Sequence, residues 1–196
     1  MLNKKISEFS EISQGSILTR IKTTNDGTMK NALTMQELSY YNNLSDSIGE
    51  PNIVQIDNKR LDGAYFAERY DVIVGLSSGK AMVIDQENVG KLILSNFVRI
   101  KINDKNEVDP YYLCWLLNEN KDIKRAITSL IQGTARVAII PMAFIRDLEV
   151  KLLPIGLQRT IGQIHDLERR RVRIQRKKEE LSQLAHNKLL MEIYRK

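Results

Sequence analysis

Residues 154–161 have the sequence Pro154-Ile155-Gly156-Leu157-Gln158-Arg159-Thr160-Ile161, and neither proline nor glycine follows Gly162. Proline is tolerated at the start of a helix, and a helix continues most easily where no later residue breaks it. This stretch therefore predicts that a globular body ends at Pro154 and that one long helix leaves it. At about 1.5 Å per residue, residues 158–193 of such a helix span about 50 Å.

The net charge of the chain lies on this helix. Residues 156–196 hold 11 Lys and Arg against 5 Asp and Glu, whereas residues 1–155 hold 19 of each, and the whole chain carries +6. Such an asymmetry between segments indicates a polyanion or an acidic partner. The alternative is an ordinary charged helix face in water.

Apolar residues of the helix form one stripe with heptad spacing, which we call the seam. Leu167, Ile174 and Leu181 are seven residues apart, and Ile164 and Ala185 extend the same stripe. A lone helix cannot bury such a stripe, so these five residues predict a helix–helix interface. The alternative is that the stripe packs against the chain's own body.

Two basic residues, Arg171 and Lys178, occupy seam positions between the apolar ones. A parallel self-pair in register places like charges opposite each other, which is unfavourable. An antiparallel self-pair, or a different partner helix, sets their aliphatic stems beside apolar residues and leaves the charged ends in water.

The fold class expected is α+β, with a mixed domain at residues 1–154 and a coiled-coil helix at residues 155–196. The apolar content of 42% is enough for a core. β-branched runs between turn residues predict short strands at 52–57, 70–76, 80–84 and 92–102, and a further strand at 148–154. Helices are expected after Thr34, whose spacing to Glu37 is that of a capping box, after Asp109-Pro110, and through Ile123, Ile127 and Ile131 to Gly133.

Several classes of protein do not fit the composition. The one cysteine, Cys114, excludes an intramolecular disulfide and a cysteine-rich zinc site, and its apolar neighbours predict a buried thiol. The N-terminus lacks the apolar stretch of a signal peptide, and no run of 18 apolar residues is present. We expect a soluble cytoplasmic protein with no membrane partner.

Three motifs are similar to catalytic ones but lack necessary parts. Asp109-Pro110-Tyr111-Tyr112 resembles the box with which amino-methyltransferases hold a flipped base, yet its third residue is tyrosine and no glycine-rich cofactor loop is present. The glycines of 75–80 are too close together for a nucleotide phosphate loop and favour a turn between two strands. Glu149-Val150-Lys151 lacks the partner carboxylate of a nuclease. The sequence predicts no catalytic residue, no metal and no cofactor.

In the order of its motifs the chain resembles one half of the specificity (S) subunit of type I restriction–modification systems. The matching segments are the opening residues 5–15, the strand Tyr70-Asp71-Val72-Ile73-Val74, the pair Asn96-Phe97-Val98 and Asp109-Pro110-Tyr111-Tyr112-Leu113, the segment Gly133-Thr134-Ala135 with Ile139, and the junction at residues 154–161. The junction is the most specific of them.

The resemblance implies a target recognition domain followed by a spacer helix. A full S subunit has two such pairs, its helices pack antiparallel, and it reads a split DNA sequence without catalysing a reaction. Methylation subunits bind around the helices and supply S-adenosylmethionine, and restriction subunits join for cleavage. Because this chain has one pair, we expect an antiparallel homodimer that reads a palindromic split target in double-stranded DNA. Pairing with a separate half subunit, or a truncated gene product, is the alternative.

The candidate DNA-contacting residues are chosen for their chemistry. Arginine and asparagine suit the edges of guanine and adenine in the major groove, and lysine suits phosphate. A polar loop at 23–27 and the loop after Gly133 contribute to this set, which is Arg20, Lys22, Asn25, Lys30, Lys59, Arg60, Arg69, Lys80, Thr134 and Arg136. Two other functions stay open: an enzyme fragment, either a methyltransferase or a nuclease, and a coiled-coil scaffold with no DNA role.

Overall fold

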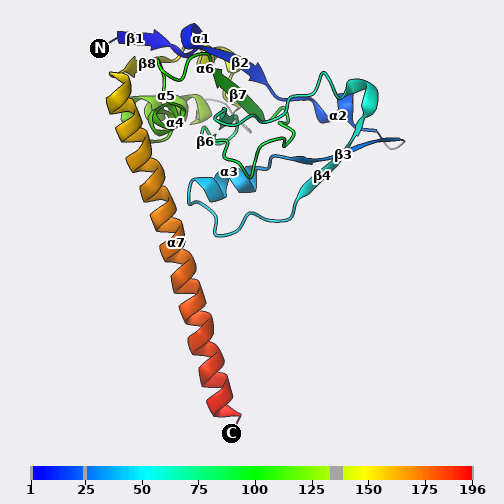
Figure 1. Ribbon diagram of the computed structural model, residues 1–196, viewed down its shortest axis with the longest axis vertical. Coiled ribbons are helices and arrows are strands. Elements are labelled where there is room, and N and C mark those ends of the chain that lie inside the picture. Colours follow the sequence, from blue (N-terminus) through cyan, green and yellow to red (C-terminus); the bar gives the residue numbers. More distant parts are fainter. Residues whose placement is uncertain (1, 24–25, 133–138, 196) are drawn as a thin grey trace.

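The computed structural model describes residues 2–23, 26–132 and 139–195 of the chain. We call residues 1–154 the head and the helix α7 (Ile155–Tyr194) the rod. The rod starts along one side of the head and then continues far beyond it (Figure 1). The expected α+β class with one long C-terminal helix is confirmed.

A four-stranded antiparallel sheet forms the centre of the head. Its strand order is β2-β7-β5-β6, with bounds β2 (Ser10–Gln14), β5 (Val72–Gly75), β6 (Ala81–Val83) and β7 (Phe97–Ile102). Ile100 of β7 lies opposite Ile12 on one side and Val72 on the other. Every residue of β5 and β6 is buried, as expected of strands covered on both faces.

Helices complete the main core. The helix α4 (Pro110–Glu119) begins as its sequence predicts, because the Asp109 carboxylate accepts a hydrogen bond of 2.9 Å from the backbone N–H of Tyr112. The helix α3 (Met35–Tyr41) has the expected capping box between Thr34 and Glu37. The helix α5 (Lys121–Gln132) buries Ile123 and Ile127 against the head.

The two ends of the head meet in a second, two-stranded sheet. β1 (Leu2–Lys5) pairs antiparallel with β8 (Glu149–Leu152), the last strand before the rod. The short helices α1 (Ile6–Phe9) and α6 (Met142–Asp147) lie beside this pair. The start of the chain is thereby fixed next to the base of the rod.

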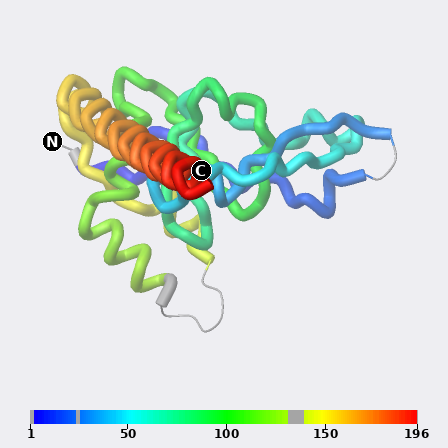
Figure 2. The backbone as a smooth tube through the Cα atoms, turned by 90° about the horizontal axis from the view of Figure 1, so that it is seen from below, coloured from blue at the N-terminus to red at the C-terminus, as the bar shows by residue number. Residues whose placement is uncertain are grey.

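A third unit, which we call the hairpin unit, projects from the head to one side of the rod (Figure 2). Its elements are α2 (Leu18–Ile21), the antiparallel strands β3 (Gly27–Ala32) and β4 (Asn52–Asp57), and the short helix η1 (Asn58–Arg60). It has a small apolar core of its own, formed by Ile21, Ala32, Val54, Ile56 and Leu92. The sequence predicted β4 but not the strand that pairs with it.

The strand expected at residues 92–102 is shorter than predicted, because β7 begins only at Phe97. The preceding residues bond to the hairpin unit instead. The Leu92 N–H donates to the carbonyl of Asn31 at 2.8 Å, and Leu92 forms isolated bridges with Ala32 and Phe66. The apolar run is therefore divided between two cores.

None of the helices in the described ranges combines the length and the apolar character that crossing a bilayer requires.

Candidate nucleic-acid interface and assembly surface

The structure brings five of the candidate DNA-contacting residues together on the hairpin unit. Lys22 forms an isolated bridge with Ile56 of β4, and Lys30 lies in β3 opposite Val54. Arg20 lies in the last turn of α2, while Lys59 and Arg60 belong to η1, which follows β4 directly. Because these elements share one small core, their basic side chains lie on one projecting unit.

Four of the five side chains are exposed, and the fifth is partly covered. Arg20, Lys22, Lys59 and Arg60 are exposed, whereas Lys30 places its ammonium 5.6 Å from the centre of the Phe66 ring. The face of an aromatic ring attracts an ammonium group at this distance, which restricts the movement of the lysine side chain. These side chains can meet a phosphate backbone without displacing the unit's core.

The outer face of the hairpin carries residues that the sequence analysis missed. Met29 and Ile53 are exposed on neighbouring strands, and Asn31, which lies opposite Ile53, is exposed between them. A two-stranded ribbon fits the major groove of B-form DNA, where an amide suits adenine and apolar groups suit the thymine methyl. In β3 only Ala32 is buried, and the sequence Gly-Thr-Met-Lys-Asn-Ala has no alternation of polar and apolar residues from which the strand could have been predicted.

The remaining candidates lie elsewhere. Arg69 lies at the junction of head and rod, beside the ring of Tyr70 at 4.8 Å. Lys80 lies in the turn between β5 and β6, which is the strand-to-strand turn expected from its glycines. Gly79 of that turn has φ +65° and packs against Ile127 of α5. Asn25, Thr134 and Arg136 fall outside the described residues.

Two basic residues of the central sheet are engaged within the head. Arg99 pairs with Asp71 at 2.7 Å and with Glu68 at 2.6 Å, and Lys101 pairs with Glu68 at 2.8 Å. Hydrogen bonds from Lys101 and Arg99 lower the pKa of Glu68. Burial raises the pKa of Asp71 despite the guanidinium beside it. These pairs stabilise the sheet and give no sign of a proton-transfer site.

Two further features of the described residues that could suggest catalysis have a structural explanation. Asp109 caps α4, so its motif is accounted for by the start of a helix. Cys114 is buried and burial raises the pKa of its thiol to about 12, which makes it a poor nucleophile. Nowhere in the described ranges do three His, Cys, Asp or Glu side chains gather where they could hold a metal ion.

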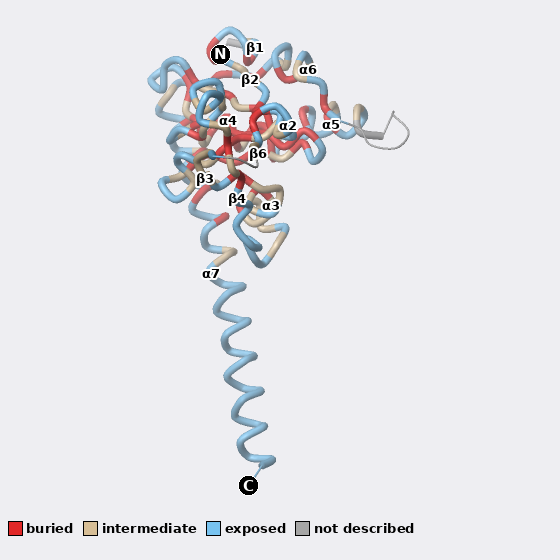
Figure 3. The backbone as a smooth tube through the Cα atoms, turned by 90° about the vertical axis from the view of Figure 1, so that its right-hand side faces the viewer, coloured by how far each residue is buried: buried red, intermediate tan, exposed pale blue. Residues whose placement is uncertain are grey.

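The apolar seam of the rod is uncovered. Ile164, Leu167, Ile174 and Leu181 are 63%, 65%, 69% and 54% exposed, and Ala185 is also exposed. Figure 3 shows the rod exposed over its whole length beyond the head. The chain's own head therefore does not cover the seam, which was the alternative use of this stripe.

The rod docks on the head through a different face. Its buried residues are Gln158, Gly162, Asp166 and Arg169. At about 100° per residue, the mean direction of these positions is about 140° from that of the seam. The seam thus faces away from the head along the shared length of head and rod.

The base of the rod is held by Gln158 and Gly162. The Gln158 amide accepts from the N–H of Asp109 at 3.0 Å and donates to the carbonyls of Leu153 at 2.7 Å and Glu107 at 3.0 Å. At Gly162, an added Cβ would lie 2.8 Å from the backbone nitrogen of Tyr112. The glycine is what lets α7 approach the start of α4 so closely.

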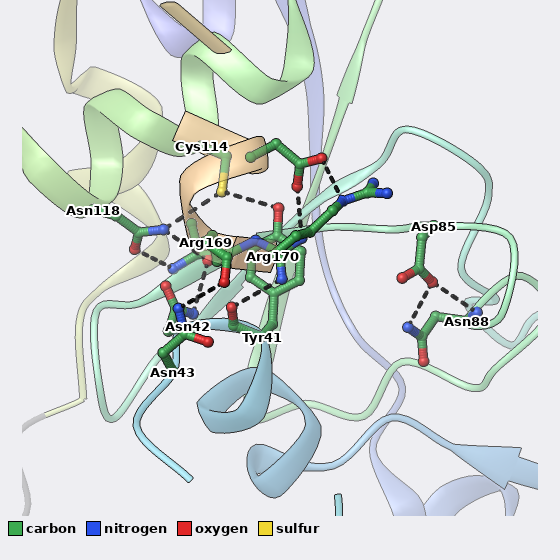
Figure 4. Close-up of polar contacts among 11 residues, drawn as sticks. Tyr41, Asn42, Asn43, Asp85, Asn88, Cys114, Asn118, Arg169 and Arg170 are labelled. Atoms are coloured by element: carbon green, nitrogen blue, oxygen red, sulfur yellow. Dashed lines mark hydrogen bonds and ion pairs between the residues drawn. The ribbon is translucent and has the colours of Figure 1, made fainter. Parts of the chain in front are cut away.

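Farther along the rod, the residues at the end of α3 contact Arg169 of α7 (Figure 4). The Arg169 guanidinium lies 3.6 Å from the centre of the Tyr41 ring and donates to the Tyr41 carbonyl at 3.1 Å. It also pairs with Asp166 at 2.6 Å. In return, the side-chain amide of Asn43 donates to the carbonyl of Arg169 at 3.1 Å. Sequence analysis had no signal for this contact, because all four residues are ordinary polar or aromatic ones.

The comparisons with known proteins agree with this geometry. By sequence, neither a family model nor a curated protein matches the chain. Among the solved structures that share its fold, three come from type I restriction–modification systems. One comes from work on complex assembly and conformational transition of the type I system, with a TM-score of 0.62, 13% identity, and coverage of 92% of this chain and 45% of that chain.

The other two are S subunits. The HsdS subunit from Thermoanaerobacter tengcongensis gives a TM-score of 0.56 at 14% identity, covering 88% of this chain and 38% of its own. The S subunit from M. genitalium gives 0.51 at 15% identity, covering 83% and 37%. The chain spans less than half the length of each structure. It therefore has the fold of one half of a type I specificity subunit, as the order of its motifs predicted.

Proposed function

We propose that this protein is the DNA-recognition subunit of a type I restriction–modification system and acts without catalytic residues of its own. The observation that carries the proposal is the uncovered seam on a rod that is docked to the head by its opposite face. The exposed seam of such a rod can pair with a second helix, while the hairpin unit stays free to contact DNA. The fold shared with S subunits supports the same role.

Two copies joined antiparallel through their seams would restore two heads on one pair of helices. In a pairing centred between Arg171 and Ile174, Ile164 faces Leu181 of the second copy, and Arg171 faces Ile174 of the second copy. Each basic stem then lies against an apolar side chain while its charge reaches water. The twofold symmetry implies a palindromic target with two half-sites.

The assembly is tested by replacing Ile174 and Leu181 with Asp. We expect the double variant to be a monomer in light scattering, with an unchanged circular dichroism spectrum, because two charges would be buried in the seam. The matched control is Gln175→Asp with Gln183→Asp, which adds the same charges off the seam and should leave the wild-type mass. A seam variant that stays dimeric contradicts the pairing. A wild-type monomer that dimerises only with another half subunit favours hetero-pairing.

DNA binding is tested on the hairpin unit. We expect Arg20→Glu with Lys22→Glu to weaken duplex binding and to reduce the slope of log affinity against log salt by about 2, if both residues contact phosphate. Fluorescence anisotropy at several salt concentrations measures both quantities. The control is Lys121→Glu with Lys124→Glu on α5, outside the hairpin unit. Equal affinity and slope in the Arg20 and Lys22 variant remove this unit from the interface.

S-adenosylmethionine and methyl transfer belong, in this proposal, to a separate methylation subunit. The purified protein with S-adenosylmethionine and DNA should transfer no methyl group until that subunit is added. Transfer by the chain alone would favour the methyltransferase alternative. Absence of any salt-dependent DNA binding would instead favour a scaffold.

A further inference from the structure

The buried contacts between the rod and the head lie at two separate levels. The lower level is Gln158 with Gly162, and the upper level is the contact of Arg169 with Tyr41 and Asn43. Arg169 lies eleven positions after Gln158, which corresponds to about 16 Å along the helix axis. Two levels define a direction, and the upper level opposes tilting of the rod about the lower one.

The upper level has strict geometry. The guanidinium stacks on the Tyr41 ring, donates to a backbone carbonyl and pairs with Asp166, so its plane and its distance are both set. Beyond it, Arg173 lies 4.9 Å from the centre of the Tyr40 ring, and Arg176 donates to the carbonyl of Asn43 at 2.6 Å. Asn43, two residues after the end of α3, has φ +57°, which is a left-handed conformation. The chain turns at this residue, where it contacts the rod.

Stability alone does not explain a buried arginine at position 169, because burying its charge carries a desolvation cost. Its side chain is only 7% exposed, and its Nε has no hydrogen-bond partner among the described residues. An apolar side chain of similar volume is often at least as stabilising as a buried ion pair. What the guanidinium adds is a geometric constraint, because one planar group meets the Tyr41 ring, the Tyr41 carbonyl and the Asp166 carboxylate together.

We propose that Arg169 is a positioning residue that fixes the tilt of the head on the rod, and thereby sets the number of base pairs between the two half-sites. This rests on the proposed function. A compact body of about 150 residues is about 40 Å across, so a tilt of about 5° moves its far side by about 3.5 Å. That displacement is about the rise of one base pair. The hairpin unit projects to the side of the rod (Figure 2), so tilting the head moves it along the rod direction.

The test uses Arg169→Gln in the full-length protein, with Arg170→Gln as the matched control. Arg170 is the next residue, and its one ion pair in the described structure is to Asp166 on its own helix. Duplexes with two half-sites are prepared with spacers that differ by single base pairs. We expect wild type and Arg170→Gln to prefer one spacer by about tenfold over its neighbours, and Arg169→Gln to reduce that preference to about threefold or less. Affinity for an isolated half-site should be unchanged.

Tyr41→Leu removes the ring from the other side of the contact and should have the same effect. Arg169→Lys keeps the charge but lacks the planar fork, so it should restore only part of the preference. A variant that is merely less stable would lose affinity for every spacer and for the half-site alike. If Arg169→Gln and Tyr41→Leu both keep the wild-type spacer preference, the proposal is wrong.

A measurement without DNA separates this proposal from the proposed function. Spin labels at Lys121→Cys on the head and Ser182→Cys on the rod report their distance, with labelled chains diluted into unlabelled protein. Wild type and Arg170→Gln should give one narrow distance distribution, and Arg169→Gln a broader one. Equal widths overturn the positioning role whatever the DNA results are. A broadened distribution in a protein that binds no DNA would support the positioning role of Arg169 and refute the DNA role instead.

Discussion

Two glycines of the same helix should respond in opposite ways to the same substitution. An added Cβ at Gly162 would lie 2.8 Å from the Asp109 carboxylate, the Tyr111 side chain and the Tyr112 backbone nitrogen, whereas at Gly156 it would meet nothing within 4 Å. The first site is the contact between the rod and the start of α4. At the second site, the added Cβ would extend into solvent.

The magnitudes follow from these surroundings. Replacing glycine by alanine in an exposed helix gains up to about 1 kcal/mol. Forcing a methyl group against backbone costs about 1–3 kcal/mol, and disturbing the Asp109 cap costs about 1 kcal/mol more. We therefore expect Gly162→Ala to lose about 1–3 kcal/mol net and Gly156→Ala to gain up to about 1 kcal/mol. At about 2–4 °C per kcal/mol for a chain of this size, the two Tm values should differ by several degrees.

Thermal unfolding followed by circular dichroism measures both variants against wild type under identical conditions. Gly162→Ala should also broaden the head–rod distance distribution, because the lower contact level is displaced. A Gly162→Ala protein that is as stable as Gly156→Ala would refute the reasoning, since it would mean that α7 does not approach α4 this closely.

Two further predictions concern titratable groups. Burial lowers the pKa of His165, so the folded state favours the neutral ring. The stability that this group contributes is fully present above the unfolded pKa of about 6.5. It is lost as the pH falls from that value through the lower pKa of the folded state. Chemical denaturation at several pH values should show that the free energy of unfolding falls toward acid pH, and that it falls less in His165→Gln. The control is His186→Gln, on the exposed part of the rod. The same dependence on pH in His165→Gln as in wild type would contradict this prediction. The Cys114 thiol, with a pKa of about 12 and full burial, should react with a disulfide reagent at neutral pH only after unfolding; rapid reaction of the native protein would mean that α4 opens readily.

Features set by neighbouring residues could be predicted from the sequence. The rod from Pro154, the seam, the cap at Asp109 and the capping box at Thr34 all depend on spacings of a few residues, which a helix turns directly into geometry. The strands β5 and β6 were also predicted, because short β-branched runs between turn residues carry their own signal. The basic residues of the hairpin unit were chosen for their chemistry, and it is the tertiary fold that gathers five of them on one unit.

Features that depend on distant pairing could not be predicted. β1 pairs with β8 across almost the whole head, and β3 was missed because its Gly-Thr-Met-Lys-Asn-Ala sequence becomes a strand only beside β4. The outer face of the hairpin, with Met29, Asn31 and Ile53, follows from that register. Arg69 was grouped with the other candidates by charge alone, and the fold places it at the junction with the rod.

The sequence by itself determined that a rod exists and which of its faces is apolar, because helical period and hydrophobicity are local properties. Only the tertiary structure decided which face meets the head. That face consists of Gln158, Gly162, Asp166 and Arg169, whose burial depends on hydrogen bonds, a close backbone approach and a stacked guanidinium supplied by other segments. Polar contacts of this kind leave no periodic trace along the chain, so the direction in which the seam points is a property of the folded molecule.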